Sequence, residues 1–168
     1  LGRTATGVRG MTLDEDDPTD RVVGMVCVEK NSPETLLVVS ENGFGKRSYL
    51  DDRDENGNII MDEDGNPATL YRITKRGAKG VRTLNVTEKT GKLVAIQAVT
   101  DDNDLMIINT SGIAIRLKIA GTRVLGRAAQ GVRLINLSKK NDVIASVCKV
   151  SAEEEEENPE IEGETPNV

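Results

Sequence analysis

The chain has 168 residues, of which 37% are hydrophobic and only 2% aromatic, and its formal net charge is −6 at pH 7. It contains no His, so imidazole general bases, Ser-His-Asp or Cys-His nucleophiles and His-ligated metals are excluded. No apolar run approaches the roughly 20 residues that cross a bilayer, and no membrane partner is expected.

A basic, Gly-rich phrase occurs three times along the chain. Residues 3–9 read RTATGVR, residues 76–82 read RGAKGVR and residues 127–133 read RAAQGVR, so each fits R-x-A-x-G-V-R. We call these the first, second and third basic turns. A short strand-like run follows each of them: MTL, TLNV and LINL. The chain therefore contains an internal repeat.

Longer predicted strands follow in the same order in each copy. A β-branched run comes next, at 21–28, 92–99 and 142–150, and a second apolar run follows in the first two copies, at 36–40 and 105–109. These two copies then reach a Gly turn and a basic strand, ENGFGKRS (41–48) and TSGIAIRLK (110–118). The third copy stops before those elements.

The repeat predicts the fold class. Gly80 and Gly131 are 51 residues apart, whereas Gly7 and Gly80 are 73 apart, because residues 49–70 form an insertion. About four short strands per copy, without helical periodicity, predict an all-β, propeller-like array of about two and a half blades over residues 1–150. Residues 151–168 hold eight Glu and no Lys or Arg, so we expect a disordered tail. Neither a signal peptide nor an initiator Met is visible, and we expect a fragment of a longer chain.

The insertion contains a match to a calcium-binding loop. Residues 52–63 fit D-x-[DN]-x-[DN]-G-x5-E, with Asp52, Asp54, Asn56 and Glu63 as candidate ligands. A helix must flank such a loop on each side, but here a strand precedes it and a Gly and a Pro follow it closely. We therefore favour an acidic hairpin, in which Asn-Gly and Asp-Gly turns bracket a short NIIM strand, and expect no metal.

Two further motifs have structural explanations. GFGKRS at 43–48 lacks the spacing of a phosphate-binding loop, so no nucleotide cofactor is expected. The two cysteines are Cys27 and Cys148. Aligned on the repeat, we place both in the slot that Ala98 fills in the second copy, and we expect buried, inert thiols in a reducing cytoplasm.

The strongest functional signal is cationic. One such turn is typically a solvated turn, but three in equivalent positions of a blade array lie along one side of the molecule. Their backbone N–H groups and cationic heads suit phosphate oxygens. Without aromatic platforms for bases, they suit a duplex backbone gripped regardless of sequence. The predicted DNA-binding set, here called the basic track, is Arg3, Arg9, Lys46, Arg47, Lys75, Arg76, Lys79, Arg82, Arg116, Lys118, Arg123, Arg127 and Arg133.

The total charge of the chain is negative because two acidic segments outweigh the positive charge of the rest. Without the tail the body carries +2, and without residues 51–66, which hold seven acids and Arg53, it carries +8. The Glu-rich tail either only solubilises the chain or competes with DNA for the basic track as a tethered polyanion.

Several long phrases resemble the final blades of the C-terminal domain of DNA gyrase A: LGRTATGVRGMTL, SENGFGKRS, YRITKRGAKGVRTLNVTEKTGKLVAI, DNDLMIINTSG and LGRAAQGVRLINL. The resemblance covers nearly all of residues 1–150 and departs from the common pattern at 51–66. It implies a β-pinwheel, a ring of blades that exchange strands and wrap duplex DNA. Other domains of gyrase A, together with gyrase B in a heterotetramer, then use ATP and Mg²⁺ to introduce negative supercoils.

The resemblance also limits the site residues. The family's hallmark basic box, Q-R-R-G-G-x-G, lies in an early blade, and residues 75–80 are only a degenerate echo of it. The active-site tyrosine lies in another domain, so Tyr49 and Tyr71 do not take that role and no catalytic residue is expected here. Three alternatives stay open: a topoisomerase IV-type domain, a propeller-like protein-interaction scaffold, and a calcium-responsive module over residues 52–63.

Overall fold

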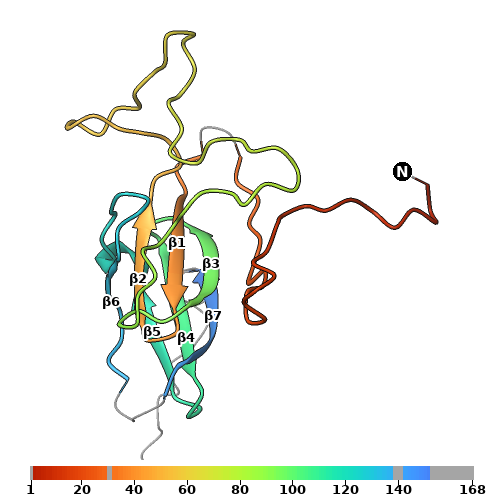
Figure 1. The fold of residues 1–168 in the computed structure, drawn as a ribbon. Helices are drawn as coiled ribbons and strands as arrows, with labels where there is room; N and C mark the ends of the chain where they lie inside the picture. Colours follow the sequence, from red (N-terminus) through yellow and green to blue (C-terminus); the bar gives the residue numbers. More distant parts are fainter. Residues whose placement is uncertain (1, 30–31, 138–141, 152–168) are drawn as a thin grey trace, which may run out of the picture.

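The computed structural model describes residues 2–29, 32–137 and 142–151, which form two antiparallel sheets (Figure 1). The first has the strand order β3-β1-β2-β6 and the second β5-β4-β7. Their bounds are β1 Thr35–Ser40, β2 Phe44–Ser48, β3 Leu93–Val99, β4 Asn103–Asn109, β5 Ala114–Lys118, β6 Val132–Arg133 and β7 Ile144–Ser151.

The predicted all-β fold is confirmed. The described residues contain no α-helix, only a 3-10 turn, η1, at Ile119–Gly121. Accordingly, no described helix has the length and apolar character to span a membrane.

Each sheet is assembled from more than one copy of the repeat. The hairpin of the first copy, β1 and β2, pairs with β3 of the second copy on one side and with β6 of the third on the other. The hairpin of the second copy, β4 and β5, pairs with β7 of the third. The registers are equivalent, because Leu37 lies opposite Arg47 in one hairpin and Met106 lies opposite Arg116 in the other. With exchanged strands and sheets that do not close into a ring among the described residues, the fold is a partial β-pinwheel.

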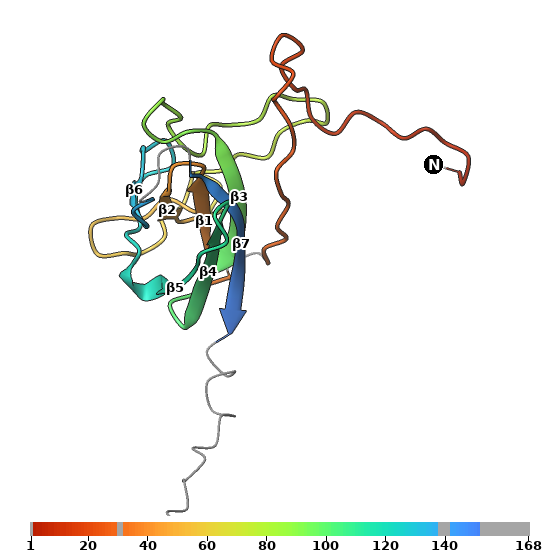
Figure 2. The ribbon, with the colours of Figure 1, turned by 90° about the horizontal axis from the view of Figure 1, so that it is seen from below.

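The core lies between the two sheets, which form two layers (Figure 2). β1 has a strand on each side and is buried along its whole length, whereas the edge strand β5 alternates exposed and half-buried residues. Burying one such apolar side chain contributes about 1.5–3 kcal/mol, so a cluster of this size holds two blades together without aromatic residues. Its members are Leu37, Val39, Val99, Leu105, Ile107, Ile119, Ile135 and Ile144.

The predicted strand at residues 21–28 does not form. Its equivalents β3 and β7 each pair with the hairpin of the preceding copy, and the sequence contains no copy before the first. Among the described residues the segment pairs with no strand, and Val22 is 66% and Met25 85% exposed. The runs MTL, TLNV and LINL form no strand either; β6 instead comprises the last two residues of the third basic turn.

The predicted burial of the two cysteines is wrong, because Cys27 and Cys148 are both exposed. Cys27 lies in the unpaired segment. Cys148 lies opposite Met106 in β4. The equivalent position of β3 holds Gln97 rather than Ala98, so the repeat alignment is one residue out of register. A shift of one residue moves a side chain to the opposite face of a strand.

The insertion folds into two short arms that project from one end of the sheets (Figure 1). Turns that contain Gly57 and Gly65 close the arms, and these are the Asn-Gly and Asp-Gly turns of the hairpin interpretation. Isolated bridges join three extended stretches into a meander: Asp51 with Thr69, Arg53 with Ile59, and Met61 with Pro67.

The candidate calcium ligand Asp54 organises one of these turns. Its carboxylate accepts hydrogen bonds from the backbone N–H groups of Asn56 and Asn58 and from the Asn58 side chain. The bonds from Asn58 hold the pKa of this carboxyl below its usual value. No helix flanks residues 52–63, and the described part of the chain contains no group of three acidic or Cys side chains placed to hold a metal ion.

Candidate nucleic-acid interface

The second basic turn lies between the third turn and the residues that follow the first turn. The N–H of Thr12, just after the first turn, donates to the carbonyl of Ala78 in the second at 3.2 Å. The Arg127 guanidinium of the third turn donates to the Arg82 carbonyl of the second. The third turn, the second turn and the residues that follow the first turn therefore form a row, while the N-terminal part of the chain projects away from the sheets (Figure 1).

One glycine in each turn has the same backbone conformation. Gly7, Gly80 and Gly131 have φ angles of 85°, 82° and 86°, in the left-handed region that residues with a side chain rarely adopt. At Gly131 an added Cβ atom would also lie 2.7 Å from the Gly45 carbonyl oxygen. The G of R-x-A-x-G-V-R is thus required by geometry, and the turns repeat a conformation as well as a composition.

Most cations of these turns face solvent. Arg127 is half-buried. The other six cations of the turns are exposed, as is Lys75 directly before the second turn: Arg3, Arg9, Lys75, Arg76, Lys79, Arg82 and Arg133. Within the described part of the chain, none of these eight side chains forms an ion pair. An external polyanion therefore reaches them without displacing a carboxylate.

The prediction that Lys46 and Arg47 add to this charged surface is wrong. Lys46 is 0% exposed and Arg47 is 6% exposed, because β2 lies between β1 and β6. The Lys46 ammonium is enclosed by protein acceptors. The Arg47 guanidinium donates to the Thr122 carbonyl and pairs with Asp101.

The remaining members of the basic track belong to the second sheet and the connection after it. Lys118 and Arg123 are exposed. Arg116 is also exposed, but its Nε lies 2.7 Å from a carboxylate oxygen of Asp104, which competes with any external anion. These three cations are not part of the row of turns.

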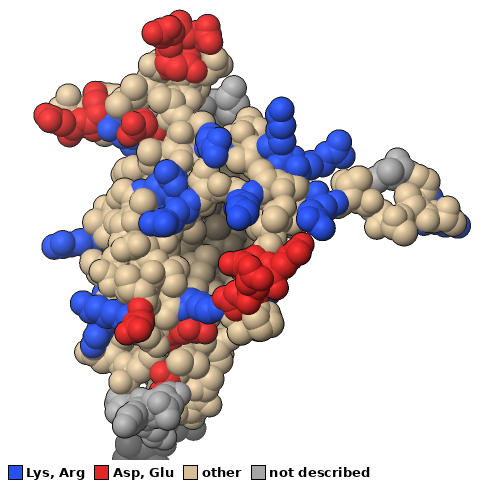
Figure 3. Space-filling model, viewed as in Figure 1, with Lys and Arg blue, Asp and Glu red and all other residues tan. Residues whose placement is uncertain are grey.

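Figure 3 shows the charges on one face of the molecule. Lys and Arg side chains surround a hollow in the middle of this face, while acidic side chains mark the tips of the insertion arms and a patch beside the hollow. A cleft of ≈ 640 Å³ lies against residues of the loop 14–21, and its other lining residues are Val23, Glu41, Val86, Lys92 and Leu93.

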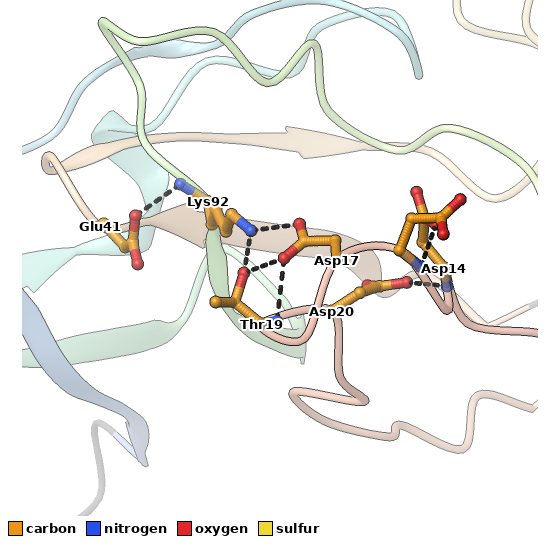
Figure 4. Close-up of polar contacts among 7 residues, drawn as sticks. Asp14, Asp17, Thr19, Asp20, Glu41 and Lys92 are labelled. Carbon is orange, nitrogen blue, oxygen red and sulfur yellow. Dashed lines mark hydrogen bonds and ion pairs between the residues drawn. The ribbon is translucent and has the colours of Figure 1, made fainter.

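The loop DEDDPTD at residues 14–20 is held to the first sheet by Lys92 (Figure 4). The Lys92 ammonium lies 2.6 Å from a carboxylate oxygen of Asp17 and also donates to the Thr19 hydroxyl. Its backbone N–H donates to the Glu41 carboxylate at 2.7 Å. The hydrogen bonds from Lys92 and then Thr19 hold the pKa of Asp17 well below its usual range. The carboxylate of Asp17 in this loop therefore neutralises the charge of the Lys92 ammonium.

Some surface cations were outside the sequence prediction. Arg21, Arg72, Lys89 and Lys149 are exposed, and none belongs to the repeated motif. Lys89 and Arg133 both lie over the Phe44 ring, at 5.5 Å and 5.1 Å from its centroid. Phe44 is the only Phe of the chain, and that rarity was the available signal for an aromatic support beneath two cations.

A family model described as DNA gyrase C-terminal domain, beta-propeller, matches residues 1–29, 34–52, 67–100 and 103–149. The chain belongs to this family of propeller-like domains. The unmatched residues 53–66 lie within the acidic insertion.

Curated relatives agree with this assignment. The chain is 42% identical over all of its 168 residues to the DNA gyrase A protein of Staphylococcus aureus strain NCTC 8325 / PS 47, and it spans 16% of that protein. For the DNA gyrase A protein of strain MRSA252, identity is 43% over 158 residues, which are 94% of this chain and 15% of the relative. The sequence thus corresponds to a small part of these relatives.

Solved structures share the fold. A DNA gyrase A C-terminal domain superposes with a TM-score of 0.52 at 28% identity, over 71% of this chain and 34% of that one. The C-terminal domain of a DNA topoisomerase IV superposes with a TM-score of 0.66 over 88% of this chain and 39% of its own, but at 21% identity, so it supports the architecture alone.

Proposed function

We propose that this chain binds duplex DNA without regard to sequence and is a DNA-wrapping part of a gyrase A protein. The observation that carries the proposal is the row of basic turns: their seven cations, and Lys75 directly before the second turn, form no ion pair within the described residues. Membership of the gyrase C-terminal domain family supports it.

The mechanism is electrostatic and geometric. Arg and Lys side chains replace condensed counterions on the phosphates, and release of those ions drives binding. Bending a site of 20–30 base pairs by 40–90° costs on the order of 1–6 kcal/mol. One exposed cation contributes about 1 kcal/mol or less, so wrapping requires several acting together, and adjacent turns in a row meet that requirement.

In the whole enzyme, we place this segment beside the catalytic domains rather than within them. We propose that it presents a bent DNA segment to the rest of gyrase A and to gyrase B in the bacterial cytoplasm. ATP-driven strand passage by those parts then introduces negative supercoils. In this proposal the segment supplies position and charge, and the catalytic groups lie elsewhere.

The test is equilibrium binding of a duplex of about 40 base pairs over a salt series, where each phosphate contact contributes about −0.9 to the slope of log K against log salt. Lys79→Gln should weaken binding severalfold and make the slope shallower by about 0.9. The matched control is Lys149→Gln, because Lys149 is outside the turns and faces Glu34 at 3.9 Å. Absence of binding at low salt by a folded sample, or strong sequence preference, contradicts the proposal.

The Glu-rich tail is tested in the same assay. Residues 152–168 lie outside the described residues, and the choice between a solubilising tail and a competitor stays a prediction. Tighter binding after their removal, with the difference shrinking at high salt, supports competition with DNA.

A further inference from the structure

Lys46 is a buried cation in a position that the neighbouring copy fills with an apolar residue. It pairs with Val38 in the first hairpin, and the same register position of the second hairpin pairs Ile107 with Ile115. Although Lys46 is 0% exposed, no carboxylate pairs with it among the described residues. Burying a charge without a counter-ion is unfavourable, so its placement needs a specific reason.

Two of its three hydrogen bonds reach the start of the third basic turn, and the third reaches Ser48 of the same strand. The Lys46 ammonium lies 3.0 Å from the carbonyl oxygen of Gly126, 2.8 Å from that of Arg127 and 2.6 Å from Ser48 Oγ. The Ser48 hydroxyl in turn donates to the Leu125 carbonyl at 3.0 Å. Two side chains of β2 therefore fix three consecutive carbonyl groups.

The same turn holds its neighbour. The Arg127 guanidinium donates to the Arg82 carbonyl of the second basic turn. An uninterrupted set of hydrogen bonds therefore runs from Lys46, inside the first sheet, through the third turn to the second.

We propose that Lys46 is a positioning residue for DNA binding: its buried ammonium sets the place of the third basic turn and, through Arg127, the spacing between the third and second turns. Lys46 does not itself contact DNA. This inference rests on the proposed DNA-binding function and names the group that holds the binding surface in register.

Proton binding at Lys46 follows from its surroundings. Burial and then the charge of Arg127 lower the pKa of Lys46 to about 8. The third turn contains two charged groups, Arg127 and, in β6, Arg133, which lies over the Phe44 ring. The partner of Lys46 in β1 is Val38, and Arg47 of β2 pairs with Asp101. No titratable acid of these elements faces the ammonium among the described residues.

Stability and DNA affinity should therefore move in opposite directions with pH. Because the folded pKa is below the unfolded one, the unfolded state binds more protons between about pH 8 and 10, and this group's contribution to stability rises with pH there. DNA affinity falls over the same range, since the neutral amine has one donor fewer for the carbonyls of the turn. If Lys46 only stabilised the fold, DNA affinity would not fall over the pH range in which its contribution to stability rises.

The experiment compares the chain with Lys46→Met and Ser48→Ala, using duplex binding between about pH 7 and 9 in a Cys27→Ser/Cys148→Ser background, because thiols titrate in that range. At pH 7, Lys46→Met should bind roughly 3- to 10-fold more weakly, equivalent to about 0.7–1.4 kcal/mol. Its pH profile should be flat, with the salt slope unchanged. Ser48→Ala should show a smaller loss. Lys46→Met is expected to fold because Ile115 occupies the equivalent position, and circular dichroism verifies this.

Amide hydrogen exchange gives a readout without DNA. Exchange at residues 127–129 should speed up in Lys46→Met and not in Lys149→Gln. Unchanged affinity and pH profile overturn this inference while the proposed function stands. A salt slope shallower by about 0.9 means that Lys46 contacts phosphate and also overturns it. If the unmodified chain binds no duplex at any pH, the proposed function itself fails, and this inference fails with it.

Discussion

Gly131 of the third basic turn lies directly against the backbone of Gly45 in β2. Its φ angle is 86°, and an added Cβ atom would lie 2.7 Å from the Gly45 carbonyl oxygen and 3.0 Å from the carbonyl carbon. Gly45 has little room to retreat, because β2 is paired on both sides. The left-handed conformation costs a residue with a side chain roughly 1–2 kcal/mol, and overpacking adds about 1–3 kcal/mol. Gly131→Ala should therefore lower the free energy of unfolding by about 2–5 kcal/mol.

Gly80→Ala is the matched control for this prediction. Gly80 has a φ of 82°, but the nearest atom to an added Cβ is the terminal methyl of Met11 at 3.7 Å, an ordinary contact. Only the conformational term applies, so the expected loss is about 1–2 kcal/mol. Urea denaturation followed by far-ultraviolet circular dichroism measures both variants. Equal losses would refute the claim that the close approach to Gly45 adds a steric cost.

Three further predictions concern charged groups and the insertion. Burial raises the pKa of Asp142, but hydrogen bonds from two hydroxyl side chains and from the backbone more than offset this and hold the pKa below its usual value. The stability that this carboxylate contributes is present above its unfolded pKa and is lost as pH falls. Between about pH 5 and 3, urea melts should therefore show a smaller decrease in the free energy of unfolding for Asp142→Asn than for the unmodified chain. Equal decreases would contradict this prediction. Arg47→Met leaves the buried Thr122 carbonyl without its donor and should cost about 1–3 kcal/mol in a urea melt, whereas Asp101→Asn, at a side chain 71% exposed, should change stability by less than about 1 kcal/mol. Replacing residues 53–66 with an Asn-Gly turn should preserve the thermal midpoint and tighten duplex binding, because the segment carries five acids and one Arg; a lowered midpoint would show that the arms support the sheets.

The strands of the two hairpins were predictable because their signal is local. The β-branched runs at 36–40 and 105–109 became β1 and β4 with only small changes at their ends. The failures depend on distant partners. Residues 21–28 resemble β3 and β7 in composition, but a strand forms only beside a hairpin of the preceding copy. Composition carries no information about which copy supplies the partner.

The row of basic turns was predictable from the repeat, whereas the burial or exposure of each cationic side chain was not. Equivalent positions of a blade array lie along one side, and the hydrogen bonds between turns agree with that expectation. The G-K-R phrase contains the same residue types, yet β2 buries both of its cations. Exposure depends on which strands lie alongside, and the strands beside β2 come from other parts of the chain.

The exchange of strands has a consequence for how the chain is built. Phe44 of the first copy pairs with Arg133 of the third, so a ribosome must complete two further copies before the first blade receives its last strand. Contacts this distant in sequence slow folding. They also spread the effect of a truncation. Removing the third copy takes β6 from one sheet and β7 from the other, so the loss of one repeat would leave two blades incomplete.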